Sequence, residues 1–142
     1  MSTVADASVD WATAGLSLNN VADLPTALAA LIRVLKPVGQ LVFTVPHPCF
    51  DAPRSTAVSI DGAVRRIVGD YTDQGFWRTT APQSVRRVGN HHRTISTYVN
   101  ALIGNGFQIT SMAEPAPNAL VCEGNPHRVG LPPFLLICAI HL

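Results

Sequence analysis

The sequence has few charged residues, no long basic run and no long apolar run, and each absence excludes a class of protein. Charged residues make up 13% of the 142 residues, and the formal net charge is +1. A nucleic-acid-binding face normally needs clustered basic residues, and the longest basic runs here are the pairs Arg65-Arg66 and Arg86-Arg87. No apolar stretch approaches the roughly 18 residues that a membrane-spanning helix needs. We therefore expect no nucleic-acid partner and no membrane association.

Cysteine is also scarce. Cys49, Cys122 and Cys138 are odd in number and widely spaced, which argues against a disulfide framework and favours a reducing compartment. The segment from Met1 to Asp6 has no basic stretch followed by an apolar core, so we expect no secretory signal and a cytoplasmic location. With 47% hydrophobic residues over 142 positions, the chain is predicted to form one globular domain with one core.

The stretch from residue 23 to residue 48 predicts a helix followed by a strand. Asp23 is a helix N-cap type, and the helix is expected to run to Lys36, before Pro37 and Gly39. The run 40–45 is rich in β-branched and aromatic residues without polar alternation, which predicts a strand covered on both faces. The apolar stripe of the helix consists of Leu24, Ala27, Leu28, Leu31, Ile32 and Leu35, at the spacing of an amphipathic helix.

An earlier strand is predicted over residues 9–18, ending before Asn19-Asn20. Strand, helix and strand with short connections predict a βαβ unit with two parallel strands. In open parallel sheets, ligands bind beyond the carboxyl ends of the strands. Leu18, Asn19 and Asn20 follow the first strand and Pro46-His47-Pro48 follows the second, so these residues are expected on one rim.

Residues 49–90 are punctuated by glycine and proline, with a short strand expected over 64–68 and Tyr71, Phe76 and Trp77 in a Gly-rich loop. The segment 51–90 fits either a lid or substrate-binding insertion, or a surface hairpin with aromatic residues packed on it. The remainder predicts a helix over 95–103 capped by Thr94, a strand over 107–112, a loop over 114–133 and a final strand over 134–140.

Six stretches of the sequence carry a resemblance to a known family: Val9-Asp10, Arg33-Val34-Leu35-Lys36-Pro37-Val38-Gly39, the segment 41–50, His91-His92-Arg93-Thr94, Asn105-Gly106-Phe107 and Pro132-Pro133-Phe134. They resemble class I S-adenosylmethionine-dependent methyltransferases of the small-molecule type. The resemblance covers about residues 5–140, and Val38 departs from it, because the family usually has a second Gly there. It implies an α/β fold with a partial Rossmann-like sheet equivalent to strands 4-5-7-6, in which strand 7 is antiparallel and the N-terminal cofactor half is missing.

The resemblance implies methyl transfer from S-adenosylmethionine to a small molecule, and it places Ala14, Gly15 and Leu18 beside the cofactor. Packing within the sheet is the alternative for these three residues. Transfer of this kind depends on holding the acceptor atom in line with the methyl group, so no catalytic triad is needed. The candidate substrate-binding residues are Asn19, Asn20, His47, His92 and Arg93.

His47 is the candidate catalytic residue, since its unperturbed pKa lies near neutrality; the alternative is a histidine that hydrogen-bonds its own turn. His92 and Arg93, with His91, fit either an anionic substrate group or a solvated loop. A metal site built from His47, Cys49, His91 and His92 lacks the paired spacing of a zinc site, so no metal is predicted. Cys49 shows no sign of an activated thiolate.

No Gly-rich loop in the sequence follows a buried strand and opens a helix, as a cofactor-binding fingerprint would. We therefore expect a truncated or split chain, whose strand 9–18 would form an unpaired edge. That edge predicts a homodimer or a complementing N-terminal half. Two alternatives stay open: a non-catalytic remnant that acts as a dimerising or partner subunit, and half of a dehydrogenase nucleotide-binding sheet.

Overall fold

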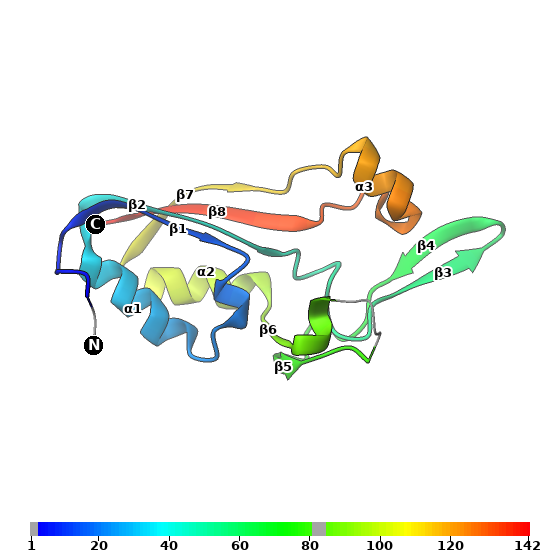
Figure 1. Cartoon of the computed structure of the whole chain (residues 1–142), viewed down its shortest axis with the longest axis horizontal. Helices are drawn as coiled ribbons and strands as arrows, with labels where there is room; N and C mark the ends of the chain where they lie inside the picture. The colour runs from blue at the N-terminus through cyan, green and yellow to red at the C-terminus, as the bar shows by residue number, and fades with distance from the viewer. Residues whose placement is uncertain (1–2, 81–84) are drawn as a thin grey trace.

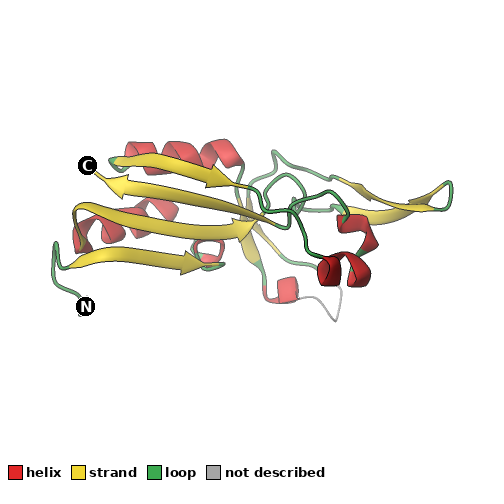
Figure 2. Ribbon diagram, turned by 90° about the horizontal axis from the view of Figure 1, so that it is seen from above, coloured by secondary structure: helices red, strands yellow, loops and turns green. Residues whose placement is uncertain are grey.

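The computed structural model describes residues 3–80 and 85–142 and has an α/β architecture (Figure 1). Its main sheet has the order β1-β2-β8-β7, and α1 and α2 both lie on one face of it (Figures 1 and 2). Side chains of β2 alternate between buried and half-buried, so the expectation of cover on both faces is wrong for the described residues. The elements of this body are β1 (Val9–Gly15), α1 (Leu24–Val34), β2 (Leu35–Pro46), α2 (Ile95–Gly104), β7 (Phe107–Ala113) and β8 (Phe134–His141).

Helix α1 begins where the sequence predicts. The carboxylate of Asp23 accepts a hydrogen bond from the Thr26 amide at 3.0 Å and another from the Thr26 hydroxyl at 2.7 Å, which satisfies a free N–H of the first turn. Leu24 and Leu28 are buried against the sheet. The helix ends at Val34, earlier than the predicted Lys36, because the chain is already extended at Leu35.

Strand β2 begins at Leu35, well before the predicted residue 40. Proline at position 37 disfavours a helical conformation at Lys36, and Leu35 pairs with Val9 of β1. The register shifts between Val9 and Trp11, opposite a stretch in which Val38 has a φ of +59°. A left-handed conformation favours glycine, so the β-branched Val38 is strained at this position.

Strands β1 and β2 are parallel, as the βαβ prediction requires. Strand β1 ends at Gly15 rather than at the predicted Leu18. Leu16 has a φ of +51°, which turns the chain out of the strand, and the 3-10 turn η1 (Leu18–Asn20) follows. Strand β8 is antiparallel to both β2 and β7. Leu18 therefore enters the core from a turn and not from the sheet.

The second half follows its predicted pattern with one exception. Thr94 caps α2 by accepting a hydrogen bond from the Thr97 amide at 3.2 Å, and β7 and β8 lie where expected. The predicted loop over 114–133 contains the short helix α3 (Ala119–Gly124) and the 3-10 turn η3 (Pro126–Arg128). Helix α3 has no buried residue, so it leaves no apolar stripe in the sequence.

The described residues between 49 and 92 form two small sheets beyond the end of β2 (Figure 1). Strands β3 (Thr56–Ile60) and β4 (Ala63–Ile67) make a hairpin that projects from the body, and β5 (Gly75–Trp77) pairs with β6 (Asn90–His92). Strand β4 confirms the predicted strand over 64–68 to within one residue at each end. The turn η2 (Val85–Val88) precedes β6, and residues 81–84 of the predicted insertion lie outside the described residues. None of the helices in the described ranges is long and apolar enough to cross a membrane.

Candidate functional site

The buried polar side chains of the described residues gather at one place, beyond the carboxyl ends of β1 and β2. Burying a polar group costs free energy unless it is hydrogen-bonded, so such a concentration marks either a structural network or a ligand site. A small cavity of about 20 Å³ lies among them, which is room for about one water molecule. The buried polar residues are Asn19, His47, Asp51, His92, Arg93 and Thr94.

Arg93 connects α2 to the turn after β1. Its guanidinium donates hydrogen bonds to the carbonyl oxygens of Leu18 at 3.3 Å, Val21 at 2.5 Å and Ala22 at 2.9 Å, and it lies 6.0 Å from the ring centroid of Tyr98. Burial is the main cause that raises the pKa of Tyr98, while the nearby guanidinium lowers it. Of the two alternatives for Arg93, the solvated loop is wrong, because the side chain is buried and bonded to main-chain carbonyls.

His92 and the loop before β5 form a second set of contacts. The Nε2–H of His92 donates to the Tyr71 carbonyl at 2.7 Å, and the Tyr71 hydroxyl accepts from the Ile95 amide at 3.0 Å. The side-chain carbonyl of Gln74 accepts from the Thr94 amide at 3.1 Å. Residues 71–74 therefore cover the N-terminus of α2, and burial raises the pKa of Tyr71.

His47 is buried at the end of β2 with both ring nitrogens engaged. Its Nδ1 accepts a hydrogen bond from the Cys49 amide at 3.3 Å, which leaves the proton on Nε2, 2.7 Å from the Glu114 carboxylate. The structure thus shows the turn hydrogen bond of the second interpretation. Neither nitrogen is left to accept a proton from a substrate in this arrangement.

The residues after β1 differ in how accessible they are. Asn19 donates from Nδ2 to Asn20 at 3.2 Å, while its buried Oδ1 has no hydrogen-bond partner among the described residues. Asn20 donates to the Leu16 carbonyl at 3.1 Å. Ala14 packs against the core and Leu18 lies within it, whereas the space where a side chain of Gly15 would stand is open.

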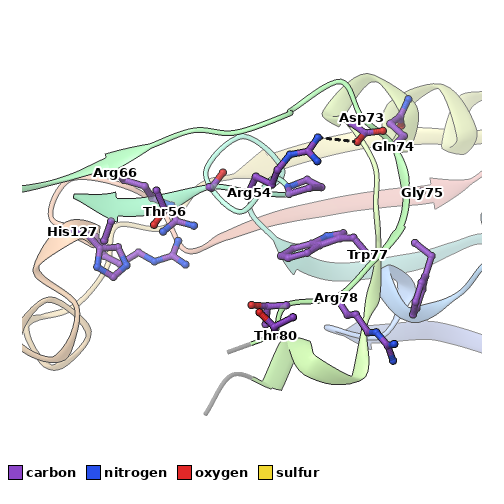
Figure 3. A pocket seen from close by; sticks show the side chains of 16 residues that line it. Arg54, Thr56, Arg66, Asp73, Gln74, Gly75, Trp77, Arg78, Thr80 and His127 are labelled. Atoms are coloured by element: carbon purple, nitrogen blue, oxygen red, sulfur yellow. Dashed lines mark hydrogen bonds and ion pairs between the residues drawn. The ribbon is translucent and has the colours of Figure 1, made fainter. Parts of the chain in front are cut away.

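The structure also assembles an ion cluster that the sequence did not indicate. The Asp51 carboxylate accepts from Arg128 at 2.5 and 3.1 Å and from Arg66 at 3.0 Å. The main cause that lowers the pKa of the neighbouring His127 is burial, followed by the charges of Arg66 and Arg128. An acidic residue shortly after a predicted strand was the one sequence feature that pointed to Asp51. Its partner Arg128 is 77 residues away, so the sequence did not indicate the cluster. Arg66, His127 and Arg128 border an open cavity of about 960 Å³ (Figure 3).

The predicted metal candidates do not come together. Within residues 3–80 and 85–142, no three His, Cys, Asp or Glu side chains are placed to hold a metal ion. Burial raises the pKa of the Cys49 thiol, so this side chain is less ionised than a free cysteine at neutral pH.

Comparisons with known proteins support the resemblance stated from the sequence. A family profile described as "Methyltransferase domain" matches residues 1–43. A crystal structure of an S-adenosylmethionine-dependent methyltransferase from Mesorhizobium loti is 29% identical with a TM-score of 0.80, covering 97% of this chain and 64% of its own. A protein assigned to the same class from Listeria monocytogenes is 26% identical with a TM-score of 0.80, covering 99% of this chain and 64% of its own.

A methyltransferase from Methanosarcina mazei shares the fold, with 18% identity and a TM-score of 0.61, over 100% of this chain and 63% of that one. A search of curated protein sequences finds no match. The chain therefore has the fold of S-adenosylmethionine-dependent methyltransferases and spans slightly less than two thirds of the length of these structures.

Proposed function

We propose that this chain takes part in S-adenosylmethionine-dependent methyl transfer to a small molecule, at the rim formed by the carboxyl ends of β1 and β2. The observation that carries the proposal is the concentration of buried polar side chains at that rim, on a sheet of order β1-β2-β8-β7. We equate these strands with the family's strands 4, 5, 7 and 6. Ligands bind at this end of open parallel sheets, and the likeness to methyltransferase structures supports the reaction class.

The described residues fit only one side of the cofactor. Gly15 offers open space at the end of β1, whereas Leu18 is turned into the core. Asp10 lies toward the other end of the strand and is held by Lys36 at 2.9 Å. S-adenosylmethionine supplies an electrophilic methyl group when bound, and in our proposal the remainder of its site comes from outside the described residues.

The chain's own residues position the acceptor molecule. Arg93 fixes the turn after β1 through three carbonyls and thereby fixes Asn19. The unpartnered Oδ1 of Asn19 can accept a hydrogen bond from an N–H or O–H of the acceptor. Proximity and orientation account for most of the rate in such an in-line transfer, so we assign Asn19, with Asn20, His47, His92 and Arg93 around it, to orientation. His47 is then a positioning residue that holds the end of β2 against Glu114.

Residues 51–80 and 85–90 form the outer wall of this site in our proposal. His92 belongs to the β5–β6 pair and borders the small cavity, and residues 71–74 cover the N-terminus of α2. Loops of this size beyond a sheet commonly bind substrate. The segment therefore serves as the substrate-binding insertion.

Calorimetric titration with S-adenosylhomocysteine tests the cofactor side of the proposal. We expect saturable binding, and we expect Gly15→Val to abolish it, because the new side chain fills the open space beside the strand end. Strand propensity favours valine over glycine, so this variant should fold. Thr13→Val on the same strand is the matched control and should bind as the parent does. Binding unaffected by Gly15→Val would contradict the placement of the cofactor.

A second candidate is a non-catalytic partner subunit, which one observation favours. Strand β1 is an edge of the sheet, and Trp11 on it is 58% exposed. Edge strands of this kind invite pairing with another chain, either a second copy or a complementing N-terminal half. A folded chain that forms a defined dimer or complex by light scattering, and that does not bind S-adenosylhomocysteine in it, would favour this candidate.

A further inference from the structure

The open cavity of about 960 Å³ lies beyond the end of β2, between the hairpin, η3 and β5. Its volume is in the range of small-molecule sites. In Figure 3, His127 and Arg66 lie on one side of it and Trp77 on the other. Arg128 also lines it. We call this space the cationic cavity.

The charges at its wall do not balance. Two guanidinium groups of the described residues, Arg66 and Arg128, contact the carboxylate of Asp51, so these three side chains together carry a net charge of +1. The three side chains are 7%, 14% and 3% exposed, so water compensates this charge poorly. A buried charge in excess is costly unless an opposite charge joins it.

The wall also has hydrogen-bond donors in excess. An arginine has five N–H donors, and the bonds of Arg128 all go to the two oxygens of Asp51. On the other side, the buried Nε1 of Trp77 has no acceptor among the described residues. Unsatisfied buried donors cost free energy, and a ligand with acceptor oxygens would satisfy the remaining donors of Arg128.

The charges of the opposite wall sum to zero. Two arginines, Arg54 and Arg78, line it, and Arg54 is paired with the carboxylates of Asp70 and, at 3.5 Å, of Asp73; Figure 3 shows the pair with Asp73. The excess positive charge therefore belongs to the side of Arg128 and His127. Asp51 also borders the small cavity at the rim, so the cationic cavity is adjacent to the proposed site of methyl transfer.

We infer that the cationic cavity binds the carboxylate or phosphate group of a small molecule, which carries a planar or apolar part that lies against Trp77. The identification of this molecule as the methyl acceptor rests on the proposed function. The binding of an anion does not, since it follows from the charges and donors of the cavity alone.

Nuclear magnetic resonance of the indole N–H groups tests the inference directly. The chain has two tryptophans, so Trp11 on the exposed edge of β1 serves as an internal control for Trp77. The probes are benzoate, phenyl phosphate and the neutral benzyl alcohol, at constant ionic strength. We expect the Trp77 signal to move saturably with one or both anions and the Trp11 signal to stay. Equal effects of benzyl alcohol and both anions, or no effect of any probe on Trp77, would overturn the inference. Comparing benzoate with phenyl phosphate distinguishes a carboxylate site from a phosphate site.

A charge-matched pair of variants locates the site. Arg128→Gln leaves Asp51 and Arg66 as a neutral pair, so the fold should survive, and we expect anion affinity to fall by about tenfold or more. Arg65→Gln removes the same charge from an exposed neighbour of Arg66 and should change affinity less than about twofold, because exposed charges are screened. Equal losses in the two variants would contradict the inference, and the titration of the parent chain decides the matter if Arg128→Gln fails to fold.

The titration with S-adenosylhomocysteine separates this inference from the proposed function. Anion binding without any binding of S-adenosylhomocysteine would uphold the cationic cavity and count against methyl transfer by this chain. Binding of S-adenosylhomocysteine with no anion effect on Trp77 would support methyl transfer and overturn the cationic cavity.

Discussion

Replacing Arg93 with methionine should destabilise the fold, because this side chain is bonded to the protein's own main chain. Its three carbonyl contacts come from a charged donor, and at about 1.5–3 kcal/mol each they amount to a gross loss of about 4.5–9 kcal/mol. Removing a buried guanidinium also recovers several kcal/mol of desolvation. We therefore expect a net loss of about 3 kcal/mol from a total of about 5–15 kcal/mol.

Urea unfolding followed by circular dichroism measures this loss as a fall of about 1–2 M in the transition midpoint. Arg65→Met is the matched control, since that arginine lies on the exposed side of the hairpin, and its effect should stay within about 0.5 kcal/mol. A loss below about 1 kcal/mol for Arg93→Met, combined with loss of benzoate or phenyl phosphate binding, would refute the reasoning. Arg93 would then bind ligand and not the turn.

Three further predictions concern other parts of the chain. Val38→Gly should raise the free energy of unfolding by about 1 kcal/mol in urea melts, because it removes the backbone strain of a β-branched residue at φ +59°. Gly39→Ala should lower the free energy of unfolding, since a Cβ there would stand 2.7 Å from a backbone oxygen. A lower stability of Val38→Gly would contradict the account. His127 should titrate by NMR below its ordinary value of 6.5 because burial and the Arg66 and Arg128 charges outweigh the attraction of Asp51. Because the unfolded chain then binds more protons, stability should fall as pH drops through 6.5, and Arg128→Gln should move the pKa back up; a His127 pKa above 6.5 would be contrary to this. Trp11→Lys should weaken any self-association measured by light scattering, since a charge on an edge strand opposes pairing, and unchanged association would exclude that edge.

The helices and strands were predictable where residues close together in the sequence determine them. The apolar stripe of α1 and its Asp23 cap, and the Thr94 cap of α2, are local signals, and the structure confirms them. The early start of β2 was not predictable, because it depends on a left-handed Val38, a conformation that β-branched residues disfavour. The pairing of Leu35 with Val9 that stabilises it is a tertiary contact.

The position of the rim was predictable, and the contacts within it were not. Residues that follow two parallel strands lie at the same edge of the sheet, so Asn19 and His47 were expected on one rim. Glu114, which pairs with His47, and Arg128, which pairs with Asp51, lie 67 and 77 residues away along the chain, and no spacing rule connects such residues. The burial of Arg93 was not predictable either. Main-chain carbonyls accept its hydrogen bonds, and every residue has such a carbonyl, so the sequence does not identify the partners.

The most direct test of the central claim is a ¹H–¹⁵N map of the chain titrated with S-adenosylhomocysteine. If the carboxyl ends of β1 and β2 are the site of methyl transfer, the amide shifts should cluster at Gly15 to Asn20, with little change at Asp6 to Asp10 toward the opposite end of the strand. Shifts confined to that opposite end, or no saturable shift in a chain that unfolds cooperatively, would contradict the claim and favour the partner-subunit role.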